Sequence, residues 1–313
     1  MLFLYRDFYI SVKPVLEVRH LTKQYKTHTA VDDLSFHVMP GEVYGFLGEN
    51  GAGKSTTLRC ILGLIKPSSG QIFIGGQPFP AAGKRLLRNI GAVVERPDMY
   101  GYFTGFENLY HFTRLCDKTI PASRLSEVLT LVGLHDRQHD RVKEYSLGMK
   151  QRLGIAIALA HEPDLLILDE PTNGLDPQGI ADIRALILHM SRDLGKTVIV
   201  SSHLLAEIEQ VATRLLILHK GKKVLEGAYQ ELIRPSETRV AVLLGAPFDT
   251  GVLQNSFWSS HLDPTTTAQE LVFRMAPEQI PELVAFLSAQ GAAIQSVDSR
   301  HSLEDLFLTL TAS

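Results

Sequence analysis

The sequence has little cysteine and no long hydrophobic run. Only two cysteines occur among the 313 residues, Cys60 and Cys116, and their spacing matches no metal-binding motif. This usage is typical of a reduced, cytosolic protein. No stretch reaches the roughly 18–20 consecutive apolar residues that a membrane-spanning helix needs, so we do not expect the chain to enter a bilayer.

A strong charge of either sign and a cleavable leader are also missing. The formal net charge is −3, so the charge balance does not indicate a nucleic-acid partner, and none is expected. The first twelve residues, MLFLYRDFYISV, are apolar but are interrupted by Arg6 and Asp7, and they lack a positively charged start and a small-residue cleavage site. We interpret residues 1–14 as a loosely held N-terminal extension that could add a packing strand.

Alternating apolar and polar residues predict antiparallel strands in the next part of the chain. Leu16 and Val18 alternate with charged residues, and the apolar residues of Leu34–Val38 alternate with polar ones. A period of two is typical of half-buried strands, so an antiparallel β subdomain is expected here.

Short apolar runs farther along the chain predict a second, parallel sheet. Val43–Leu47 runs into a glycine-rich turn, and three later runs are separated by helical patterns, namely Leu165–Leu168, Thr197–Ser201 and Leu215–Leu218. Short runs of this kind between helices are typical of a sheet that is buried on both faces. Between about residues 90 and 161 the pattern is mainly helical, which predicts a helical insert in an α/β core.

The pattern of apolar and polar residues changes around Pro235. The tail offers short strands and helices, at Val240–Leu244, Leu271–Met275, Pro281–Gln290 and from Ser302 onward. We therefore expect an α/β domain over residues 15–235 and a small accessory α+β domain over residues 236–313. The tail contains no cluster of residues of a catalytic type.

The strongest chemical signal is a glycine-rich segment between a predicted strand and a predicted helix. It reads Gly48-Glu49-Asn50-Gly51-Ala52-Gly53-Lys54-Ser55, a complete G-x-x-x-x-G-K-S/T pattern. Its glycines let backbone N–H groups point at a phosphate chain, and the following helix adds its positive N-terminal end. Lys54 can reach the β- and γ-phosphates, and the Ser55 hydroxyl can bind Mg²⁺. We expect this segment and the adjoining Thr56 to bind a nucleotide.

An acidic pair follows the apolar run Leu165–Leu168. Asp169 at the end of this strand is expected to hold Mg²⁺ through water, and Glu170 to orient or deprotonate the attacking water. Taken alone, such a pair could equally be a helix cap or a solvated turn. The phosphate-binding pattern favours the metal and catalytic roles.

Three further segments, in a fixed order after the first two motifs, resemble the ATPase domains of ABC transporters. Tyr145-Ser146-Leu147-Gly148-Met149-Lys150-Gln151-Arg152 resembles that family's signature, usually LSGGQ, Asn173-Gly174-Leu175-Asp176 resembles its D-loop, and Ser201-Ser202-His203 resembles its switch-histidine segment. The resemblance covers roughly Val15 to Arg234. It implies a P-loop NTPase core of the α/β class with an antiparallel β subdomain and a helical insert, followed by the small C-terminal α+β domain.

The resemblance also implies roles for single residues. Ser146 can cap the helix that follows it and, with Gly148, form a second anion site, which in the family meets the γ-phosphate held by a partner subunit. Asp176 would lie across the dimer seam, and His203 would contact the γ-phosphate. Tyr25 stands where the family places an aromatic ring under adenine. An ordinary capped helix, a structural histidine and a packing tyrosine are the alternatives for Ser146, His203 and Tyr25.

Two departures from the family pattern point to a subfamily. The family usually has glutamine between its core and its helical insert, where it binds Mg²⁺ and senses the membrane partner, but this chain offers Glu95. A carboxylate can also bind Mg²⁺, although it adds negative charge and cannot donate a hydrogen bond as an amide does. The signature carries Leu147 and Met149 in place of glycine and glutamine. These changes, and the tail that ends Ser302–Phe307, resemble the drug- and bacteriocin-exporter subfamily, including bacitracin- and lantibiotic-resistance ATPases.

As a whole, the resemblance implies an enzyme that hydrolyses ATP, with ATP and Mg²⁺ as cofactors. Its expected partners are a second ATPase subunit, in the simplest case an identical chain, and separate integral membrane permease subunits that export a drug or peptide antibiotic. The chain would then be cytoplasmic and peripheral on the inner face of the cell membrane. An importer ATPase and an ABC-type ATPase of translation or DNA repair are the alternatives. Two segments receive a purely structural interpretation, Glu207–Glu209 as a solvated helix face and Lys220–Lys223 as a hairpin turn.

Overall fold

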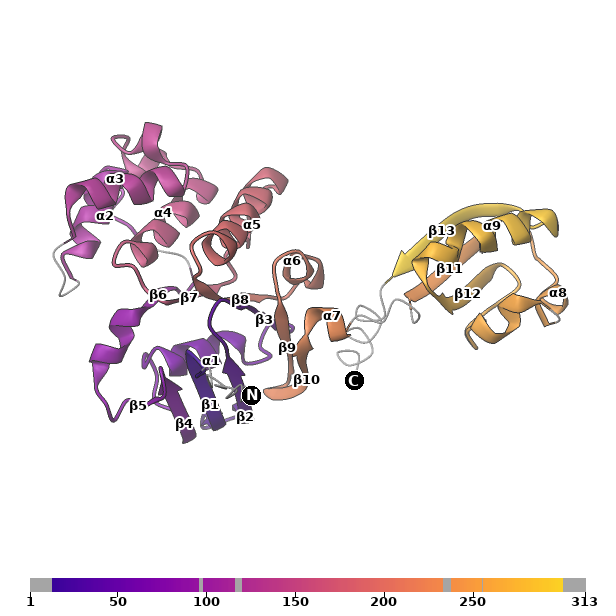
Figure 1. Ribbon diagram of the computed structural model, residues 1–313, viewed down its shortest axis with the longest axis horizontal. Helices are drawn as coiled ribbons and strands as arrows, with labels where there is room; N and C mark the ends of the chain where they lie inside the picture. The colour runs from indigo at the N-terminus through magenta and orange to yellow at the C-terminus, as the bar shows by residue number, and fades with distance from the viewer. Residues whose placement is uncertain (1–12, 96–97, 116–119, 233–237, 255, 301–313) are drawn as a thin grey trace, which may run out of the picture. The chain divides into compact units, whose positions relative to one another are not determined.

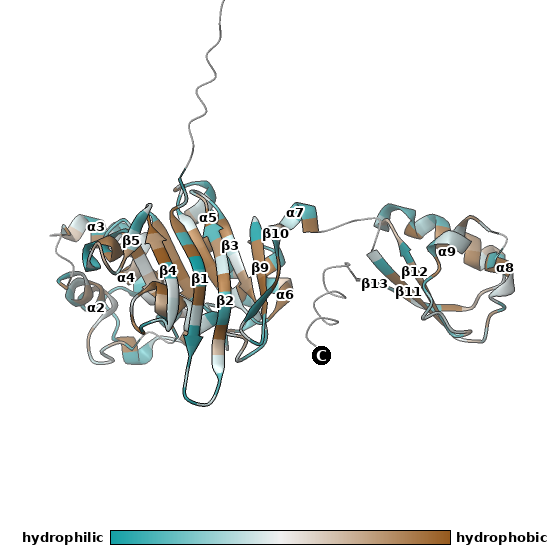
Figure 2. Cartoon of the chain, turned by 90° about the horizontal axis from the view of Figure 1, so that it is seen from below, coloured by the Kyte–Doolittle hydropathy of each residue, from teal (hydrophilic) through white to brown (hydrophobic). Residues whose placement is uncertain are grey.

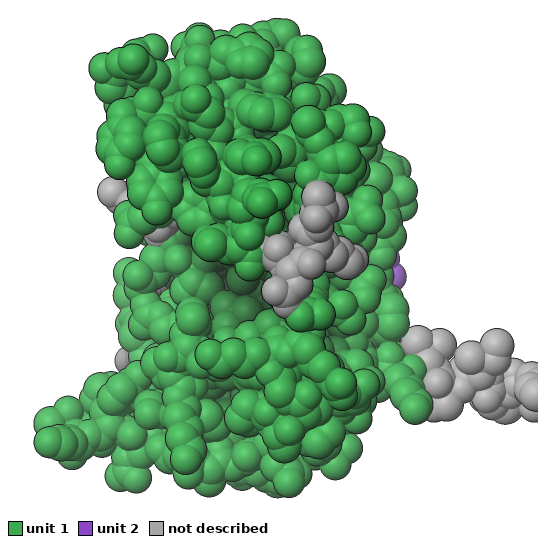
Figure 3. Space-filling model, turned by 90° about the vertical axis from the view of Figure 1, so that its left-hand side faces the viewer, with its two compact units in different colours: residues 1–226 green, residues 227–313 purple. Residues whose placement is uncertain are grey.

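The computed structural model describes residues 13–95, 98–115, 120–232, 238–254 and 256–300. It divides into two compact units, residues 1–226 and residues 227–313, and Figure 3 shows one face of the larger unit in green. The division falls inside strand β10 (Lys222–Ala228), a few residues before the change in residue pattern around Pro235. The extension over residues 1–12 and the helix expected from Ser302 lie outside the described residues.

The larger unit begins with an antiparallel sheet of four strands in the order β2-β1-β4-β5. Its strands are β1 (Leu16–Gln24), β2 (Thr29–Val38), β4 (Ser69–Ile74) and β5 (Gln77–Phe79). Leu16 of β1 pairs with Val38 of β2, and both side chains are buried. Brown and teal bands alternate along β1 in Figure 2, because apolar residues face the core and polar residues face the solvent. The predicted antiparallel β subdomain is therefore confirmed.

A second sheet has six strands in the order β10-β9-β3-β8-β7-β6. Besides β10 it contains β3 (Val43–Leu47), β6 (Ile90–Val93), β7 (Leu165–Asp169), β8 (Thr197–Ser202) and β9 (Arg214–His219). Strand β3 is parallel to β8 and β9, and β7 is parallel to β6 and β8. Every residue of β3, β7 and β8 is buried, which confirms the predicted parallel sheet. The carboxyl ends of these three strands therefore meet at one edge.

A helix follows each of the strands β3, β7 and β8 along the chain. Helix α1 (Lys54–Ile61) follows β3, α5 (Pro177–Arg192) lies between β7 and β8, and α6 (Leu205–Glu209) follows β8. Apolar residues of α5 at helical spacing, such as Ile183 and Met190, are buried. Residues 220 and 221 join the neighbouring strands β9 and β10, so the predicted hairpin turn is confirmed.

The helical insert consists of α2 (Gly105–Thr113), α3 (Ala122–Leu131) and α4 (Leu147–Leu159), which contact one another (Figure 1). The prediction that the insert begins at about residue 90 was wrong over its first residues. Ile90–Val93 forms strand β6 and pairs with β7 instead. A four-residue apolar run is too short for its periodicity to distinguish a buried strand from a turn of helix.

The smaller unit has its own sheet and its own core. Its sheet has the order β12-β11-β13, with β11 (Thr238–Leu244), β12 (Glu270–Met275) and β13 (Ile294–Arg300), and its helices are α7 (Tyr229–Leu232), α8 (Gly251–Gln254) and α9 (Ile280–Ala289). Phe273 and Trp258 are buried in one cluster with Leu283 of α9. The expected strands β11 and β12 and the expected helix α9 are confirmed, whereas β13 was missed because it is largely exposed and its sequence is polar.

A buried tyrosine links strand β3 to the end of the larger unit. Tyr44 is fully buried, and its hydroxyl donates a hydrogen bond of 2.9 Å to Glu226 Oε1. Lys223 Nζ donates to Glu226 Oε2 at 2.7 Å, and Arg214 Nη2 donates to Oε1 at 3.3 Å. Burial by itself would raise the pKa of Glu226, but the hydrogen bonds from Lys223 and Tyr44 and the charges of Lys223 and Arg214 hold it below its ordinary value.

We expect Tyr44→Phe to lower the free energy of unfolding of the larger unit by about 1–3 kcal/mol at pH 7, because the partly buried carboxylate of Glu226 loses one hydrogen-bond donor. The pKa of Glu226 is lower in the folded than in the unfolded protein, so its stabilisation is present above the unfolded pKa and is lost as the pH falls through the folded pKa. The effect of the substitution should therefore shrink in acid. Urea unfolding followed by circular dichroism at pH 7 and at pH 3–4 measures it, and an equal loss at both pH values would contradict this explanation.

The only tryptophan of the chain, Trp258, lies in the core of the smaller unit, so its fluorescence reports on that unit alone. We expect Phe273→Ala to destabilise this unit by about 3–5 kcal/mol. The tryptophan transition in urea should shift, while a separate circular-dichroism transition of the larger unit stays unchanged. Leu243→Ala, at an exposed position of the same sheet, is the control and should cost much less. A joint shift of both transitions would mean that the two units do not unfold independently.

Candidate nucleotide-binding site

The glycine-rich turn joins β3 to α1 at the carboxyl edge of the parallel sheet. Gly51 and Gly53 have φ angles of +84° and +104°, which strain any residue with a side chain. A Cβ atom on Gly53 would lie 2.4 Å from the carbonyl oxygen of Ala30, and one on Gly48 would lie 2.4 Å from that of Leu218. No side chain of the described residues caps α1, so the N–H groups of its first turn can bind an anion.

Lys54, the first residue of α1, is held inside this turn. Its side chain is only 5% exposed, and Nζ donates hydrogen bonds of 2.6 Å to the carbonyl oxygen of Gly48 and 3.2 Å to that of Glu49. The third neighbour of Nζ is Glu170 Oε1 at 3.2 Å. The ammonium group is therefore fixed in position, and its charge is balanced by a carboxylate that follows another strand.

The acidic pair is fixed by strand β8. Asp169 lies opposite Ser201 in the parallel register, and Ser201 Oγ donates a hydrogen bond of 2.6 Å to Asp169 Oδ1. The same hydroxyl accepts a hydrogen bond of 2.9 Å from the backbone N–H of Glu170. Glu170 adopts a left-handed conformation, with φ +49°, directly after β7. One buried hydroxyl thus orients both acidic residues.

The carboxylate of Glu170 connects the phosphate loop with the end of β8. Its Oε1 atom faces Lys54, and its Oε2 atom lies 2.8 Å from His203 Nδ1. The side chain is 19% exposed, so water can still reach it. A carboxylate in this position can accept a proton from water, and the neighbouring imidazole can fix its orientation. The structure thus brings Lys54, Asp169, Glu170 and His203 to one edge of the sheet.

Two residues expected at the rim of the site have neighbours that the sequence did not indicate. Glu95 is 67% exposed, has a φ of +62° and forms an ion pair with Arg59 of α1. Tyr25 is 38% exposed, and its ring stacks on His28 at a centroid distance of 5.3 Å. Lys23 Nζ lies 4.9 Å from the centroid of the Tyr25 ring.

The signature segment begins helix α4 as expected. Ser146 is its N-cap, and Oγ accepts a hydrogen bond of 3.2 Å from the backbone N–H of Met149. A Cβ atom on Gly148 would find no described atom nearer than 3.9 Å, and that atom belongs to Leu175, so the space in front of this glycine is open. Asp176 is exposed and caps α5 by accepting a hydrogen bond of 3.0 Å from Gly179 N.

The expectation that Glu207 and Glu209 form a solvated helix face was wrong. Both are half-buried, and Glu207 Oε2 accepts hydrogen bonds from the hydroxyls of Thr172 and Ser202, each 2.7 Å long. The Glu207 carboxylate faces inward because the parallel strands bring Thr172, 35 residues away in sequence, beside α6. Ser202 is the last residue of β8, the strand that precedes α6. Sequence analysis also gave no separate role to Ser201, although a hydroxyl after a buried strand, next to an acidic strand end, is a usable signal.

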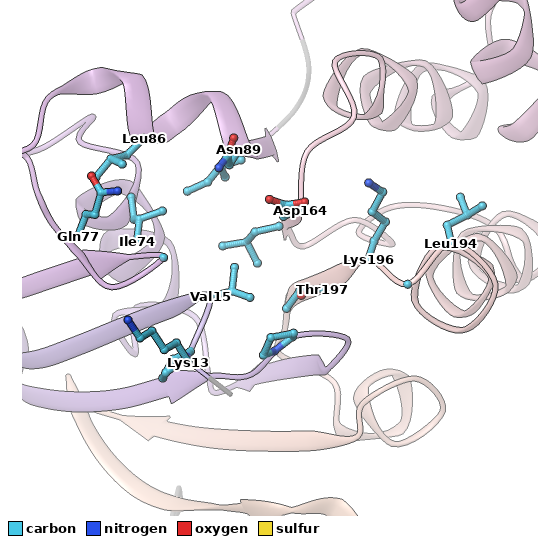
Figure 4. A pocket seen from close by; sticks show the side chains of 16 residues that line it. Lys13, Val15, Ile74, Gln77, Leu86, Asn89, Asp164, Leu194, Lys196 and Thr197 are labelled. Atoms are coloured by element: carbon cyan, nitrogen blue, oxygen red, sulfur yellow. The ribbon is translucent and has the colours of Figure 1, made fainter. Parts of the chain in front are cut away.

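A cavity of about 570 Å³ lies at the other edge of the sheet (Figure 4). Asp164 and Lys196, which line it, directly precede β7 and β8, and Thr197 is the first residue of β8. These are the amino ends of the strands, whereas the phosphate loop and the acidic pair follow the carboxyl ends. This cavity is therefore not part of the candidate site.

None of the helices in the described part of the chain is both long enough and apolar enough to cross a membrane.

Comparisons with known proteins agree with this geometry. The family model described as ABC transporter matches residues 31–173. The chain is 47% identical to the bacitracin transport ATP-binding protein BcrA of Bacillus licheniformis, over 95% of this chain and 97% of that protein. It is 42% identical to the uncharacterized ABC transporter ATP-binding protein YhcH of Bacillus subtilis, over 96% and 97%. It is 39% identical to the lantibiotic transport ATP-binding protein SrtF of Streptococcus pyogenes, over 69% and 91%.

Two solved structures share the fold of the larger part of the chain. One is cbiO1 of Clostridium perfringens, part of an ABC transporter complex, with a TM-score of 0.64 and 29% identity over 70% of this chain and 90% of that one. The other is a dimeric ATP-binding cassette in a post-hydrolysis state with ADP and Pi, with a TM-score of 0.62 and 25% identity over 68% and 98%.

We expect Lys54→Ala to weaken ATP binding roughly 10- to 150-fold, because charge-assisted contacts to the phosphates, worth about 1.5–3 kcal/mol, are lost. Equilibrium titration with a fluorescent ATP analogue measures the dissociation constant. Lys84→Ala removes an exposed lysine of the same unit and is the matched control. Unchanged affinity in Lys54→Ala would rule out the phosphate role of this residue.

Proposed function

Because the chain belongs to the family of ABC transporter ATP-binding subunits, we propose that it uses Glu170 as the base in ATP hydrolysis and energises export of a peptide antibiotic. The chain is an ATPase of this family, similar over nearly its whole length to a bacitracin transport protein. The observation that carries the catalytic part is the position of the Glu170 carboxylate, between Lys54 and His203 at the end of a buried strand.

In the proposed reaction the glycine-rich turn and the first turn of α1 hold the phosphate chain through backbone N–H groups. Lys54 binds the β- and γ-phosphates. Glu170 accepts a proton from the water that attacks the γ-phosphate, and His203 orients this carboxylate and contacts the transferred group. Ser201 keeps Asp169 and Glu170 aligned, because its hydroxyl is hydrogen-bonded to the Asp169 carboxylate and to the backbone N–H of Glu170.

The oxygen donors at this edge of the sheet fit Mg²⁺. Asp169 offers a buried carboxylate and Ser55 offers a hydroxyl in the first turn of α1. These two residues would hold the ion, which would supply positive charge against the phosphates. Glu95, the third expected ligand, would have to exchange its ion pair with Arg59 for the metal.

A second ATPase subunit would complete the site. Ser146 and Gly148 begin helix α4, and the space in front of Gly148 is open, which suits the approach of a γ-phosphate held by another copy. Asp176 is exposed on the segment beside this signature, where it can contact the same nucleotide across the seam. Two ATP molecules would then join two subunits head to tail, and hydrolysis would separate them.

Separate membrane-spanning subunits would convert this closure into transport, with the chain attached to the cytoplasmic face of the membrane. The relatives named for bacitracin and lantibiotic transport favour a peptide antibiotic as the exported compound. A relative from Burkholderia pseudomallei, 35% identical, is named for export of Nod factor. Transport is therefore common to these names, while the transported compounds differ.

We expect Glu170→Gln to bind ATP but to hydrolyse it about 10²- to 10⁴-fold more slowly, because an amide cannot accept the proton. With ATP the variant should accumulate as a dimer, which size-exclusion chromatography with light scattering detects. Glu231→Gln, an exposed substitution on α7, is the control and should retain turnover. Hydrolysis at the normal rate in Glu170→Gln would contradict the assigned base.

The transport proposal needs its own readout. The chain, co-expressed with its membrane subunits in a bacitracin-sensitive host, should raise the inhibitory concentration of bacitracin, and Glu170→Gln should abolish this protection. A lantibiotic and an unrelated antibiotic test the selectivity. If the chain hydrolyses ATP but protects the host against neither bacitracin nor the lantibiotic, the proposed substrate class is wrong. The ATPase assignment would still stand.

A further inference from the structure

Glu207 of α6 forms a bridge between two segments that flank the proposed catalytic groups. Its Oε2 atom accepts one hydrogen bond from Thr172 Oγ1 and one from Ser202 Oγ, both 2.7 Å long. Thr172 lies two residues after Glu170, and Ser202 directly precedes His203. A single carboxylate oxygen therefore ties the segment after the base to the segment before the histidine.

Little else in the surroundings could satisfy these hydroxyls. Thr172 and Ser202 are buried, at 8% and 1% exposure. The cavity that they line together with Glu207 has a volume of only about 10 Å³, at the lower limit for one water molecule. The carboxylate is therefore the acceptor that both hydroxyl groups depend on, and a buried hydroxyl that loses its partner is unfavourable.

Further hydrogen bonds connect Ser202 and Thr172 to the residues that follow each of them. Ser202 Oγ also accepts a hydrogen bond of 3.0 Å from the backbone N–H of Leu204, which shapes the chain around His203. On the other side, the Leu175 N–H donates to the carbonyl oxygen of Thr172, and the Asn173 N–H donates to that of Glu170, both at 3.1 Å. Fixing Thr172 thus also fixes the segment that leads to Asp176.

We propose that Glu207 is a positioning residue for ATP hydrolysis, which holds the Glu170 and His203 side chains at their mutual distance of 2.8 Å. It acts through the Thr172 and Ser202 hydroxyls and does not itself contact the nucleotide. The inference rests on the catalytic roles proposed for Glu170 and His203, and it is independent of which compound is exported.

Two substitutions separate hydrogen bonding from volume. Glu207→Met keeps a similar length and cannot accept these hydrogen bonds, whereas Glu207→Gln keeps an acceptor oxygen. We expect the methionine variant to lower kcat for ATP at least 10-fold with KM changed less than about twofold, and we expect glutamine to restore most of the rate. Gln210→Ala, at an exposed position that follows the same helix, is the control.

Hydrogen exchange supplies a readout that does not require hydrolysis. In Glu207→Met the amides of Asn173 and Leu175 should exchange faster than in the parent protein, while those of the phosphate loop stay unchanged. Thr172→Val should slow turnover in the parent protein but add little in the Glu207→Met background, because both changes break the same contact. The single variants Thr172→Val and Ser202→Ala test the bridge should Glu207→Met fail to fold.

Unchanged kcat and unchanged exchange in Glu207→Met would overturn the inference. So would a glutamine variant that loses as much activity as the methionine variant, or additive effects of Thr172→Val and Glu207→Met. Failure of the proposed function looks different, since it appears as normal hydrolysis in Glu170→Gln whatever residue stands at position 207.

Discussion

The parallel register of three buried strands is the constraint on which the site depends. Because β3, β7 and β8 run in the same direction side by side, their carboxyl ends place Lys54, Glu170 and His203 at one edge of the sheet. These residues are far apart in sequence, yet the Glu170 carboxylate contacts both of the others. A register slip of one residue would turn Asp169 away from Ser201 and separate the acidic pair from its hydroxyl.

Hydroxyl groups hold this edge together as much as charges do. Ser201 orients Asp169 and the backbone of Glu170, and Thr172 and Ser202 meet at Glu207. All three hydroxyls are buried, so each bond is protected from competition with water. The charged groups that contact phosphate and water are thereby held in fixed positions. Electrostatic stabilisation of phosphoryl transfer requires such preorganised groups.

The sequence allowed prediction of features that depend on local patterns. The glycine-rich turn, the alternation in β1 and the Ser146 cap follow from neighbouring residues, and the structure contains each of them. Contacts between distant residues could not be predicted in the same way. Glu207 was predicted to be solvated because one of its two hydrogen-bond donors, Thr172, lies 35 residues away. The ion pair of Glu95 with Arg59 likewise joins two segments that no local pattern relates. Strand β6 was missed because four residues carry too little periodicity.

A double-mutant cycle of Glu170→Gln and His203→Ala, read out as ATP turnover, tests most directly whether these two side chains act as one unit. The distance of 2.8 Å between them predicts that each single substitution slows hydrolysis strongly and that the double variant is hardly slower than the slower single one. Losses that multiply in the double variant would contradict the account, because they would mean that the carboxylate and the imidazole work independently.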